Sequence, residues 1–339
     1  MSKIGIVSDL HLGHRKVNIK NYTEVLNKLQ NIHSVDMIVD CGDIFDTSTI
    51  NAVNAKEIKD AFKDINIPIH IIRGNHDTLS EVSVASMLDL SSNITIHNSV
   101  DMLCFNNQSF LFVPYVNSKT ELNKSLGFVE EQVNFAFSHL NLTNNFYATF
   151  STKTADKYFH KSAEYWFNGH IHTPEIYSSL FGKIYNVGSV SNLTYGDEHK
   201  PCYAIFDTIT LEYKDFYIDN SIIHKTFSLQ DIDDLQSILD DLKQLYSNNL
   251  WNLRIKIPNS FLTEEKDKIK DIINSYLTDK ILEVQFDYLS SNNNNVEIKN
   301  LSTQQNKSKQ PLVYQLFTEY ELKGKILDKD IKEEIIEEI

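Results

Sequence analysis

The sequence predicts an α/β fold in which a mainly parallel sheet packs against a second, mixed sheet. Up to residue 77, three short apolar runs alternate with two helical patterns, an order that indicates parallel strand pairing. Beyond residue 77 the apolar stretches shorten and alternate with polar residues, as in strands with one face toward solvent. With 339 residues, of which 41% are hydrophobic, the chain can bury one large core and still carry smaller additions.

The elements of the first sheet follow one another along residues 3–77. We expect strands at 3–8, 36–40 and 69–73, with helices at 22–32 and 52–62 between them. The apolar run 69–72, broken only by His70, is typical of a strand covered on both faces. For the second sheet we expect strands at 94–96, 109–113, 184–187, 203–206 and 211–218.

The composition changes near residue 228, which indicates a second domain. Helical patterns at 231–246 and 263–276 alternate with apolar runs at 251–257 and 281–287. Residues 290–310 are too polar to be buried and predict a flexible linker. We therefore divide the chain into a main domain (1–224), a small α/β domain (225–289), a linker (290–310) and a helical segment (311–339).

Side chains that bind metals or transfer protons follow five of the apolar runs. The stretch Gly74-Asn75-His76-Asp77, for example, begins where the run ending at residue 73 stops. The carboxyl ends of strands line the ligand crevice of an open α/β sheet, so these side chains are expected to converge. The candidate metal ligands are Asp9, His11, Asp43, Asn75, His139, His170 and His172, with His76 and Asp77 beside them.

The chemistry of this set points to two divalent metal ions. Carboxylate and imidazole ligands without thiolates suit Mn²⁺, Fe²⁺ or Zn²⁺. Seven ligands are too many for one tetrahedral ion and suit a pair that clamps an in-line displacement at phosphorus. One carboxylate must then bridge the ions, and Asp43 is the natural candidate.

An ordinary structural role can explain each motif taken alone, but it explains the whole set poorly. An isolated Asp-x-His pair or a lone histidine after a strand most often belongs to an ordinary turn. Five such groups at strand ends in one order are not expected by chance. Cys41, which adjoins Gly42-Asp43, lies within a predicted buried strand and is interpreted as core packing.

The ordered set of Asp9-x-His11, Gly42-Asp43, Gly74-Asn75-His76-Asp77, His139 and Gly169-His170-x-His172 resembles the calcineurin-type metallophosphoesterase superfamily. The opening Asp9 to Gly13, the stretch Gly42 to Asp46 and the later Tyr195 to Glu198 resemble the SbcD-type recombination nucleases, particularly their bacteriophage members. This closer resemblance covers about residues 1–220. It implies a two-sheet sandwich flanked by helices.

The resemblance also implies roles for the site residues. It assigns Asp9, His11, Asp43 and His172 to one ion, and Asp43, Asn75, His139 and His170 to the other. Manganese is the expected metal, with magnesium as the alternative. His76 would protonate or hydrogen-bond the leaving oxygen, and Asp77 would orient the His76 imidazole.

One position departs from the family pattern. Many SbcD-type enzymes have a second functional histidine after the Gly-Asp-x-Phe stretch, where this chain has Asp46. A catalytic scheme that uses two histidines is therefore in doubt. We interpret Asp46 as a cap of the following helix, expected to begin near Ser48, on which no ligand depends.

The resemblance implies a nuclease with a macromolecular partner. Family members act as exonucleases on duplex DNA ends and as endonucleases on single strands, and the small α/β domain helps to select the substrate. The helical segment 311–339 would grip the coiled coil of an SbcC-like ATPase of the SMC type, within a heterotetramer that contains a nuclease homodimer. Packing of this segment on its own domain or on a second copy is the alternative.

Two other classes of function are compatible with parts of the sequence. A metallophosphatase acting on phosphoproteins or small phosphoesters is the alternative on the same scaffold. Phosphoprotein phosphatases carry Gly-Asp-x-x-Asp-Arg-Gly, whereas this chain has Asp46-Thr47-Ser48 in that region and lacks the arginine clamp. A scaffold with a decayed site is disfavoured because no ligand position is lost.

The net charge of −14 argues against broad, non-specific attraction to nucleic acid. DNA contacts are expected instead from Arg15 and Lys16, or from Lys153, Lys157 and Lys161. The three lysines would share one helical face. A basic face that only contacts solvent is equally expected. The three cysteines are scattered, and no apolar run is long enough to span a membrane or to act as a secretory signal. We therefore expect a cytoplasmic location, which for a viral protein means the cytoplasm of the host.

Overall fold

The computed structural model describes most of the chain up to residue 289. The described residues are 3–79, 82–88, 90–105, 107–127, 129, 132–143, 150–151, 162–178, 183–197, 199–219, 221–231, 233–244, 250–275 and 281–289. The predicted linker 290–310, the predicted helical segment 311–339 and the three lysines Lys153, Lys157 and Lys161 lie outside them. The predictions made for these parts remain predictions.

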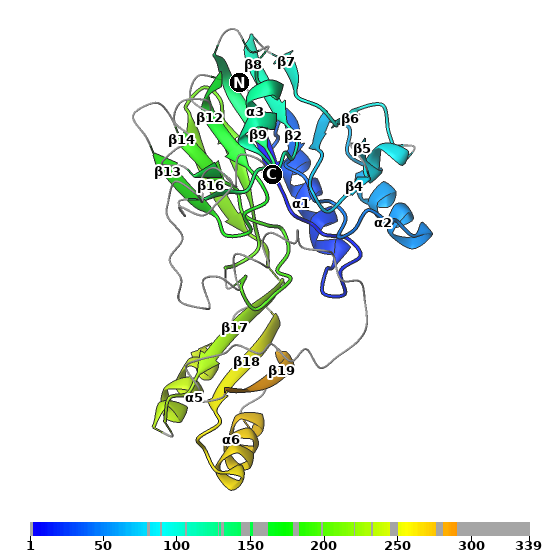
Figure 1. Ribbon diagram of the computed structural model, residues 1–339. Helices are drawn as coiled ribbons and strands as arrows, with labels where there is room; N and C mark the ends of the chain where they lie inside the picture. The colour runs from blue at the N-terminus through cyan, green and yellow to red at the C-terminus, as the bar shows by residue number, and fades with distance from the viewer. Residues whose placement is uncertain are drawn as a thin grey trace, which may run out of the picture. The chain divides into compact units, whose positions relative to one another are not determined.

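Two six-stranded sheets form the main domain and face each other (Figure 1). The first has the order β16 (Glu212–Tyr217), β15 (Cys202–Asp207), β1 (Lys3–Val7), β2 (Met37–Asp40), β3 (Ile69–Ile72) and β6 (Ile94–His97). The second has the order β13 (Glu175–Ser178), β14 (Lys183–Asn186), β12 (Ala163–Asn168), β9 (Val133–Ser138), β8 (Gln108–Val113) and β7 (Asp101–Phe105). The central strands of both sheets are parallel, and antiparallel strands lie at their margins.

The predicted division of strands between the sheets is partly wrong. The runs at 109–113 and 184–187 lie in the second sheet as predicted, but those at 94–96, 203–206 and 211–218 belong to the first. Strand β6 pairs in parallel with β3, while β15 pairs antiparallel with β1 and β16 with β15. Strands β6 and β16 lie at the two margins of the first sheet and are partly exposed, whereas β15 lies between β16 and β1 and is largely buried. Such patterns indicate how far a strand is buried, but not the sheet that it joins.

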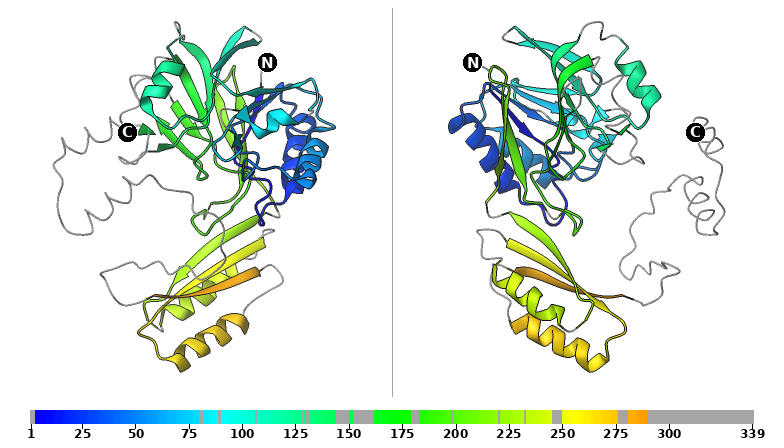
Figure 2. Two further views of the ribbon diagram at one scale, coloured as in Figure 1. Left: turned by 45° about the vertical axis from the view of Figure 1, so that its right-hand side comes forward. Right: turned by 90° about the vertical axis from the view of Figure 1, so that its left-hand side faces the viewer.

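Helices cover the outer faces of the sandwich (Figure 2). Helix α1 (Ile19–Asn31) begins at Asn18, whose side chain accepts a hydrogen bond from Lys20 N, and buries Val25, Leu26 and Leu29. It shares one core cluster with α2 (Ala52–Phe62) and the outward face of the first sheet. The short 3₁₀ helix η1 (Val84–Met87) adds Val84 and Ala85 to the same cluster. On the opposite side, α3 (Lys119–Ser125) packs on the second sheet.

The layer between the sheets is rich in aromatic side chains. Phe112 and Phe137 stack with ring centroids 5.8 Å apart, and Phe137 and Phe167 with centroids 5.1 Å apart. All three are completely buried, as is Cys41, so the prediction that this cysteine packs in the core is confirmed. Large rigid rings fix the spacing of the sheets and hence the strand ends that face each other beyond them.

A small α/β domain follows the sandwich. Its sheet contains three parallel strands, β17 (Ile222–Ser228), β18 (Leu250–Pro258) and β19 (Ile281–Leu289), with helices α5 (Asp234–Gln244) and α6 (Thr263–Ser275). The sequence prediction missed β17, because polar side chains interrupt its apolar residues. The predicted boundary after residue 224 consequently falls inside a strand, and the sheet of this domain begins at Ile222.

Two further pairs of short strands lie in the loops, β4 (Thr78–Leu79) with β5 (Val82–Ser83), and β10 (Leu142–Thr143) with β11 (Phe150–Ser151). Within the described part of the chain, no helix combines the length and the apolar character that crossing a membrane requires.

A buried histidine pair makes the stability of the sandwich dependent on pH. His70 Nδ1 lies 3.0 Å from His97 Nε2, and both rings stack on Phe112. Burial, together with the neighbouring His97, lowers the pKa of His70 to about 4. As the pH falls below 6.5, His70 becomes protonated in the unfolded chain, whereas in the folded chain it stays neutral until about pH 4. The folded state therefore loses stability as the pH falls between these two values.

We expect His70→Gln to flatten the acid side of the stability curve. Between pH 6 and 4.5 the unfolding free energy of the parent chain should fall by about 1.4 kcal/mol per pH unit more than that of the variant. Urea unfolding at a series of pH values measures both slopes. Parallel curves for the two proteins would show that His70 does not cause the loss of stability.

Candidate metal centre

The predicted site residues converge where strand ends of both sheets meet. Asp9 and His11 follow β1, Asp43 follows β2 and Asn75 follows β3, all in the first sheet. His139 follows β9, and His170 and His172 follow β12, in the second sheet. The prediction placed the site at the strand ends of a single open sheet. In the structure the site lies instead between the strand ends of two facing sheets. All seven predicted ligands nevertheless come together.

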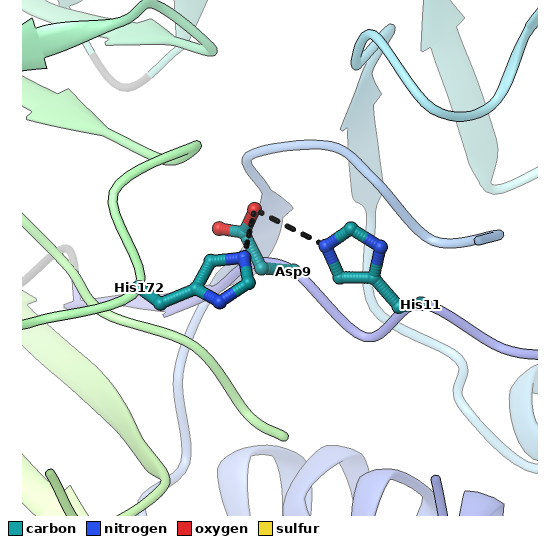
Figure 3. Close-up of side chains that lie close together, drawn as sticks. All are labelled: Asp9, His11 and His172. Atoms are coloured by element: carbon teal, nitrogen blue, oxygen red, sulfur yellow. Dashed lines mark ion pairs between the residues drawn. The ribbon is translucent and has the colours of Figure 1, made fainter. Parts of the chain in front are cut away.

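The first cluster contains Asp9, His11 and His172 (Figure 3). Asp9 Oδ1 lies 3.8 Å from His11 Nε2 and 3.7 Å from His172 Nε2, and the two imidazole rings meet edge-on with their centroids 5.2 Å apart. The second cluster contains Asp43, His139 and His170. Its members lie close to the first, so the two groups form one centre.

Asp43 lies between the two clusters. Its Oδ2 is 3.8 Å from His11 Nε2 on one side and 3.1 Å from His139 Nε2 on the other. Asn75 Oδ1 completes the second cluster, 3.1 Å from His139 Nε2 and 2.8 Å from His170 Nδ1. This is the position that a carboxylate shared by two ions requires.

Four of these residues have a strained backbone. Their φ angles are positive, at 57° for Asp9, 53° for His11, 55° for Asp43 and 69° for His170. Residues with a Cβ seldom adopt this left-handed region, and when they do they often belong to functional sites. All four lie in the turns that follow their strands, so the left-handed backbone sets the direction in which these ligand side chains leave the turn.

Glycines allow the strand ends to approach one another. A Cβ on Gly42, whose φ is 102°, would lie 2.7 Å from His139 Nδ1. That nitrogen is 2.6 Å from the carbonyl oxygen of Cys41, to which it donates a hydrogen bond, so that Nε2 faces Asp43. Fixing one ring nitrogen to leave the other as a ligand is the usual arrangement of histidines in metal sites.

Unsatisfied buried atoms show that the residues fit a cation. Asp9 Oδ1 and His11 Nε2 are buried and have no hydrogen-bond partner. Buried polar atoms without partners are rare because each costs free energy. A divalent cation bound by Asp9, His11, Asp43 and His172 would satisfy both atoms.

The electrostatics of the pocket favour positive charge at the same place. Burial alone would lower the pKa of His11 and of His139, but nearby carboxylates raise them to about 10 and about 9. For Asp43, burial is outweighed by His139, which holds the pKa of the carboxyl below its usual value. Protons on the two histidines thus balance the buried carboxylates, and metal ions would displace them.

Asp77 does not have the predicted role. It is completely buried, and its carboxylate oxygens accept hydrogen bonds from Gly74 N, at 3.0 Å, and Ile44 N, at 3.2 Å. The expectation that it orients His76 is wrong, since both of its oxygens face the backbone. Asp77 instead ties the turn after β3 to the turn after β2, and so fixes the position of Asp43 relative to Asn75.

Asp46 takes the place that was predicted for Asp77. His76 Nδ1 lies 3.0 Å from the carbonyl oxygen of Asp46, and His11 Nδ1 lies 3.4 Å from its carboxylate Oδ1. The interpretation of Asp46 as a helix cap is wrong, because helix α2 begins after Asn51, whose side chain accepts a hydrogen bond from Asn54 N. Asp46 therefore holds two histidines of the site.

Sequence reasoning missed Asn168, the last residue of β12. Its Oδ1 accepts hydrogen bonds from Ser138 Oγ, at 2.7 Å, and Leu140 N, at 2.9 Å. Its Nδ2 lies 3.0 Å from Leu140 O and 2.7 Å from Gly169 O. The amide thus joins the loops that carry His139 and His170, although a single asparagine in an apolar run gives no signal in the sequence.

We expect Asn168→Asp to destabilise the protein by about 3 kcal/mol or more, because a carboxylate cannot donate to the two carbonyl groups and places an unpaired charge in the interior. Asn134→Asp is the matched control, since the exposed Asn134 uses only its Oδ1, as acceptor for Ser109. Chemical unfolding of both variants tests the difference. Equal stabilities would contradict the role of the amide.

Comparison with known proteins identifies the class to which the fold and site belong. A family model described as calcineurin-like phosphoesterase matches residues 2–174, half of the chain. The chain therefore belongs to the calcineurin-like phosphoesterase family, whose members hydrolyse phosphoesters with divalent metals.

Individual relatives are more distant. The chain is 40% identical, over an alignment of 88 residues, to the DNA double-strand break repair protein Mre11 of Saccharolobus solfataricus, and the alignment covers 23% of this chain and 23% of that protein. Among solved structures, an archaeal phosphodiesterase is 18% identical, with 64% of this chain and 99% of that chain covered and a TM-score of 0.40. A dimetal phosphatase from Danio rerio is 11% identical, with 60% and 91% covered and a TM-score of 0.44.

Proposed function

We propose that this chain is a two-metal DNA phosphodiesterase, the nuclease subunit of an SbcCD-like recombination and repair complex. It would cut duplex DNA from its ends and single strands internally. The observation that carries the two-metal mechanism is the position of Asp43 between two clusters of nitrogen and oxygen ligands. Asp9, His11, Asp43 and His172 would hold one ion, and Asp43, Asn75, His139 and His170 the other.

The ions, expected to be manganese with magnesium as the alternative, would supply positive charge and Lewis acidity at the phosphate. The chain's own contribution is to orient the phosphodiester and to move protons. His76 is exposed at this edge, its Nδ1 lies 3.0 Å from the Asp46 carbonyl oxygen, and one of its ring nitrogens lies within 4.8 Å of ligand atoms of His11 and Asp43. From there, His76 Nε2 would donate a proton to the leaving oxygen.

DNA is the proposed substrate because of the 88-residue similarity to a DNA repair protein and the order of motifs that resembles SbcD-type nucleases. The arginine clamp of phosphoprotein phosphatases is missing after Asp46. We further propose that residues 311–339 contact an SbcC-like ATPase, and that the chain forms a homodimer within a heterotetramer. The proposal also includes a bacteriophage origin and a cytoplasmic location. The partner, the assembly and the origin follow from the same resemblance, and the location follows from the scattered cysteines.

The test is DNA degradation by the purified chain in Mn²⁺, Mg²⁺ or EDTA, on linear duplex and single-stranded DNA, with a phosphoprotein as the competing substrate. We expect metal-dependent DNA cleavage that His76→Ala lowers by a factor of about 100 to 10,000. His33→Ala is the control, because His33 contacts Tyr203 and lies outside the site. Hydrolysis of the phosphoprotein without cleavage of DNA would overturn the proposal in favour of a phosphatase.

A further inference from the structure

The turn formed by residues 192–197 lies beside His172 and also contacts the small α/β domain. We infer that Asp197 is a positioning residue for His172, and that this turn couples the attachment of the small domain to the metal centre. The inference rests on the proposed function, since it treats His172 as a metal ligand. Nothing in the motif spacing singled out Asp197 for this role.

Asp197 holds His172 from the side away from Asp9. Its Oδ1 lies 3.2 Å from His172 Nδ1, while His172 Nε2 lies 3.7 Å from Asp9 Oδ1. A carboxylate can only accept a hydrogen bond, so it keeps the imidazole proton on Nδ1 and leaves the lone pair of Nε2 directed at the first cluster. The Asp197 side chain is only 13% exposed, which strengthens the interaction.

The other oxygen of Asp197 shapes the turn itself. Oδ2 accepts hydrogen bonds from Leu193 N, at 3.0 Å, and Thr194 N, at 2.9 Å. Asn192 Nδ2 donates to the carbonyl oxygens of Asp197, at 2.7 Å, and His199, at 2.6 Å, and so closes the turn. A turn held by this many bonds moves as one body, so a shift at Tyr195 in its middle also shifts Asp197.

Tyr195 joins this turn to the small domain. Its hydroxyl donates a hydrogen bond to Leu253 O in β18, at 3.2 Å. The guanidinium of Arg254 lies 4.2 Å from the centre of the Tyr195 ring, and Lys16 Nζ lies 5.0 Å from it. Arg254 is fixed in turn by Asp287 of β19, at 3.3 Å.

A second contact supports the same connection. His224 Nε2, in β17, lies 3.4 Å from Asn192 O, and its ring meets that of Tyr195 edge-on, with centroids 4.9 Å apart. The small domain therefore contacts both the first residue of the turn and its middle. If the domain changes its position, the turn must follow or lose these contacts, and either event alters the support of His172. By linkage, metal binding must stabilise the attached domain to the same extent.

Manganese binding to the full chain, measured by titration calorimetry without nucleic acid, tests the inference. We expect Asp197→Asn to weaken one of two ions by a factor of about 10 to 100 and to spare the other. Asp207→Asn is the matched control, because Asp207 accepts hydrogen bonds from Ile209 N and Thr210 N in a turn remote from the site. It should bind manganese as the parent chain does.

A test of the coupling between the small domain and the metal centre requires a substitution at a residue that does not contact a metal ligand. Tyr195→Leu should weaken the same ion by a factor of about 2 to 30. Tyr288→Leu, which removes another tyrosine between two cations, Lys266 and Lys270, should have no effect. Tyr195→Phe removes only the hydroxyl and serves if the leucine variant does not fold. In the double variant with Asp197→Asn, the effect of Tyr195→Leu should largely disappear, since the link is already broken.

Hydrogen exchange gives a readout independent of affinity. Manganese should slow exchange of the Leu193 and Thr194 amides in the parent chain and less in Tyr195→Leu. A parent chain that binds no manganese would refute the proposed function itself. Two bound ions with parent-like affinity in Asp197→Asn would refute the positioning role alone, and full additivity in the double variant would refute the coupling.

Discussion

Asp43→Asn should abolish tight binding of both metal ions at once, whereas loss of any other ligand should weaken one. Asp43 Oδ2 faces both clusters, and the asparagine amide would present a neutral oxygen or an N–H group there. Loss of a residue that merely supports a ligand weakens metal binding by a factor of about 10 to 100, so loss of the shared ligand should cost more for each ion. Calorimetric titration with Mn²⁺ measures both affinities.

The fold should survive this change, because the variant keeps the shape of the side chain and the acceptor for His76 N, which lies 2.8 Å from Asp43 Oδ1. Asp36→Asn is the control, since Asp36 likewise accepts a backbone N–H, that of Lys3, but lies outside the site. Retention of one tightly bound ion in Asp43→Asn would contradict a shared carboxylate. DNA cleavage should fall with metal binding.

Gly74→Ala should disrupt the same centre by steric conflict. A Cβ at this position would overlap Asp43 Oδ1 and the Asp43 backbone nitrogen, and would lie 2.8 Å from Asp43 Cγ. These atoms belong to a turn whose residue Asp43 already has a positive φ, so it has little freedom to move. We expect a loss of about 3 kcal/mol in unfolding free energy together with loss of manganese binding.

Gly127→Ala provides the comparison, because there the nearest atom to a new Cβ is Lys124 O at 3.3 Å. That variant should bind manganese normally and unfold within about 1 kcal/mol of the parent chain. Thermal and urea unfolding, followed by manganese titration of the folded variants, distinguishes the two. A Gly74→Ala protein that binds both ions normally would show that the turn can relax around the methyl group.

The sequence was sufficient to predict the two-sheet class and the convergence of the ligands. Helix α2 has the predicted bounds of 52–62, and β1, β2 and β3 lie within the predicted ranges. The reason is physical: a covered strand must be apolar throughout, so a change from apolar residues to Asp, His or Asn marks the place where its carboxyl end reaches solvent or a site.

The sequence could not predict with which residue a buried polar side chain forms its hydrogen bonds. Asp77 adjoins His76 in the chain, yet its oxygens face backbone amides, while the distant Asp46 contacts that histidine. Asp197 and Asn168 act through contacts with residues 25 and 28 positions away, which no local spacing reveals. The same applies to the strand at 203–206, because its apolar run indicates burial but not the sheet that it joins.

The left-handed backbone at Asp9, His11, Asp43 and His170 has a consequence for how such a protein can change over generations. Each of these positions costs about 1–3 kcal/mol that glycine would not incur. Glycine would relieve this strain but would also remove contacts that support the fold, such as the acceptor that Asp43 provides for His76 N. In a descendant that no longer requires catalysis, glycine should therefore appear first at those of the four positions whose side chains support the fold least.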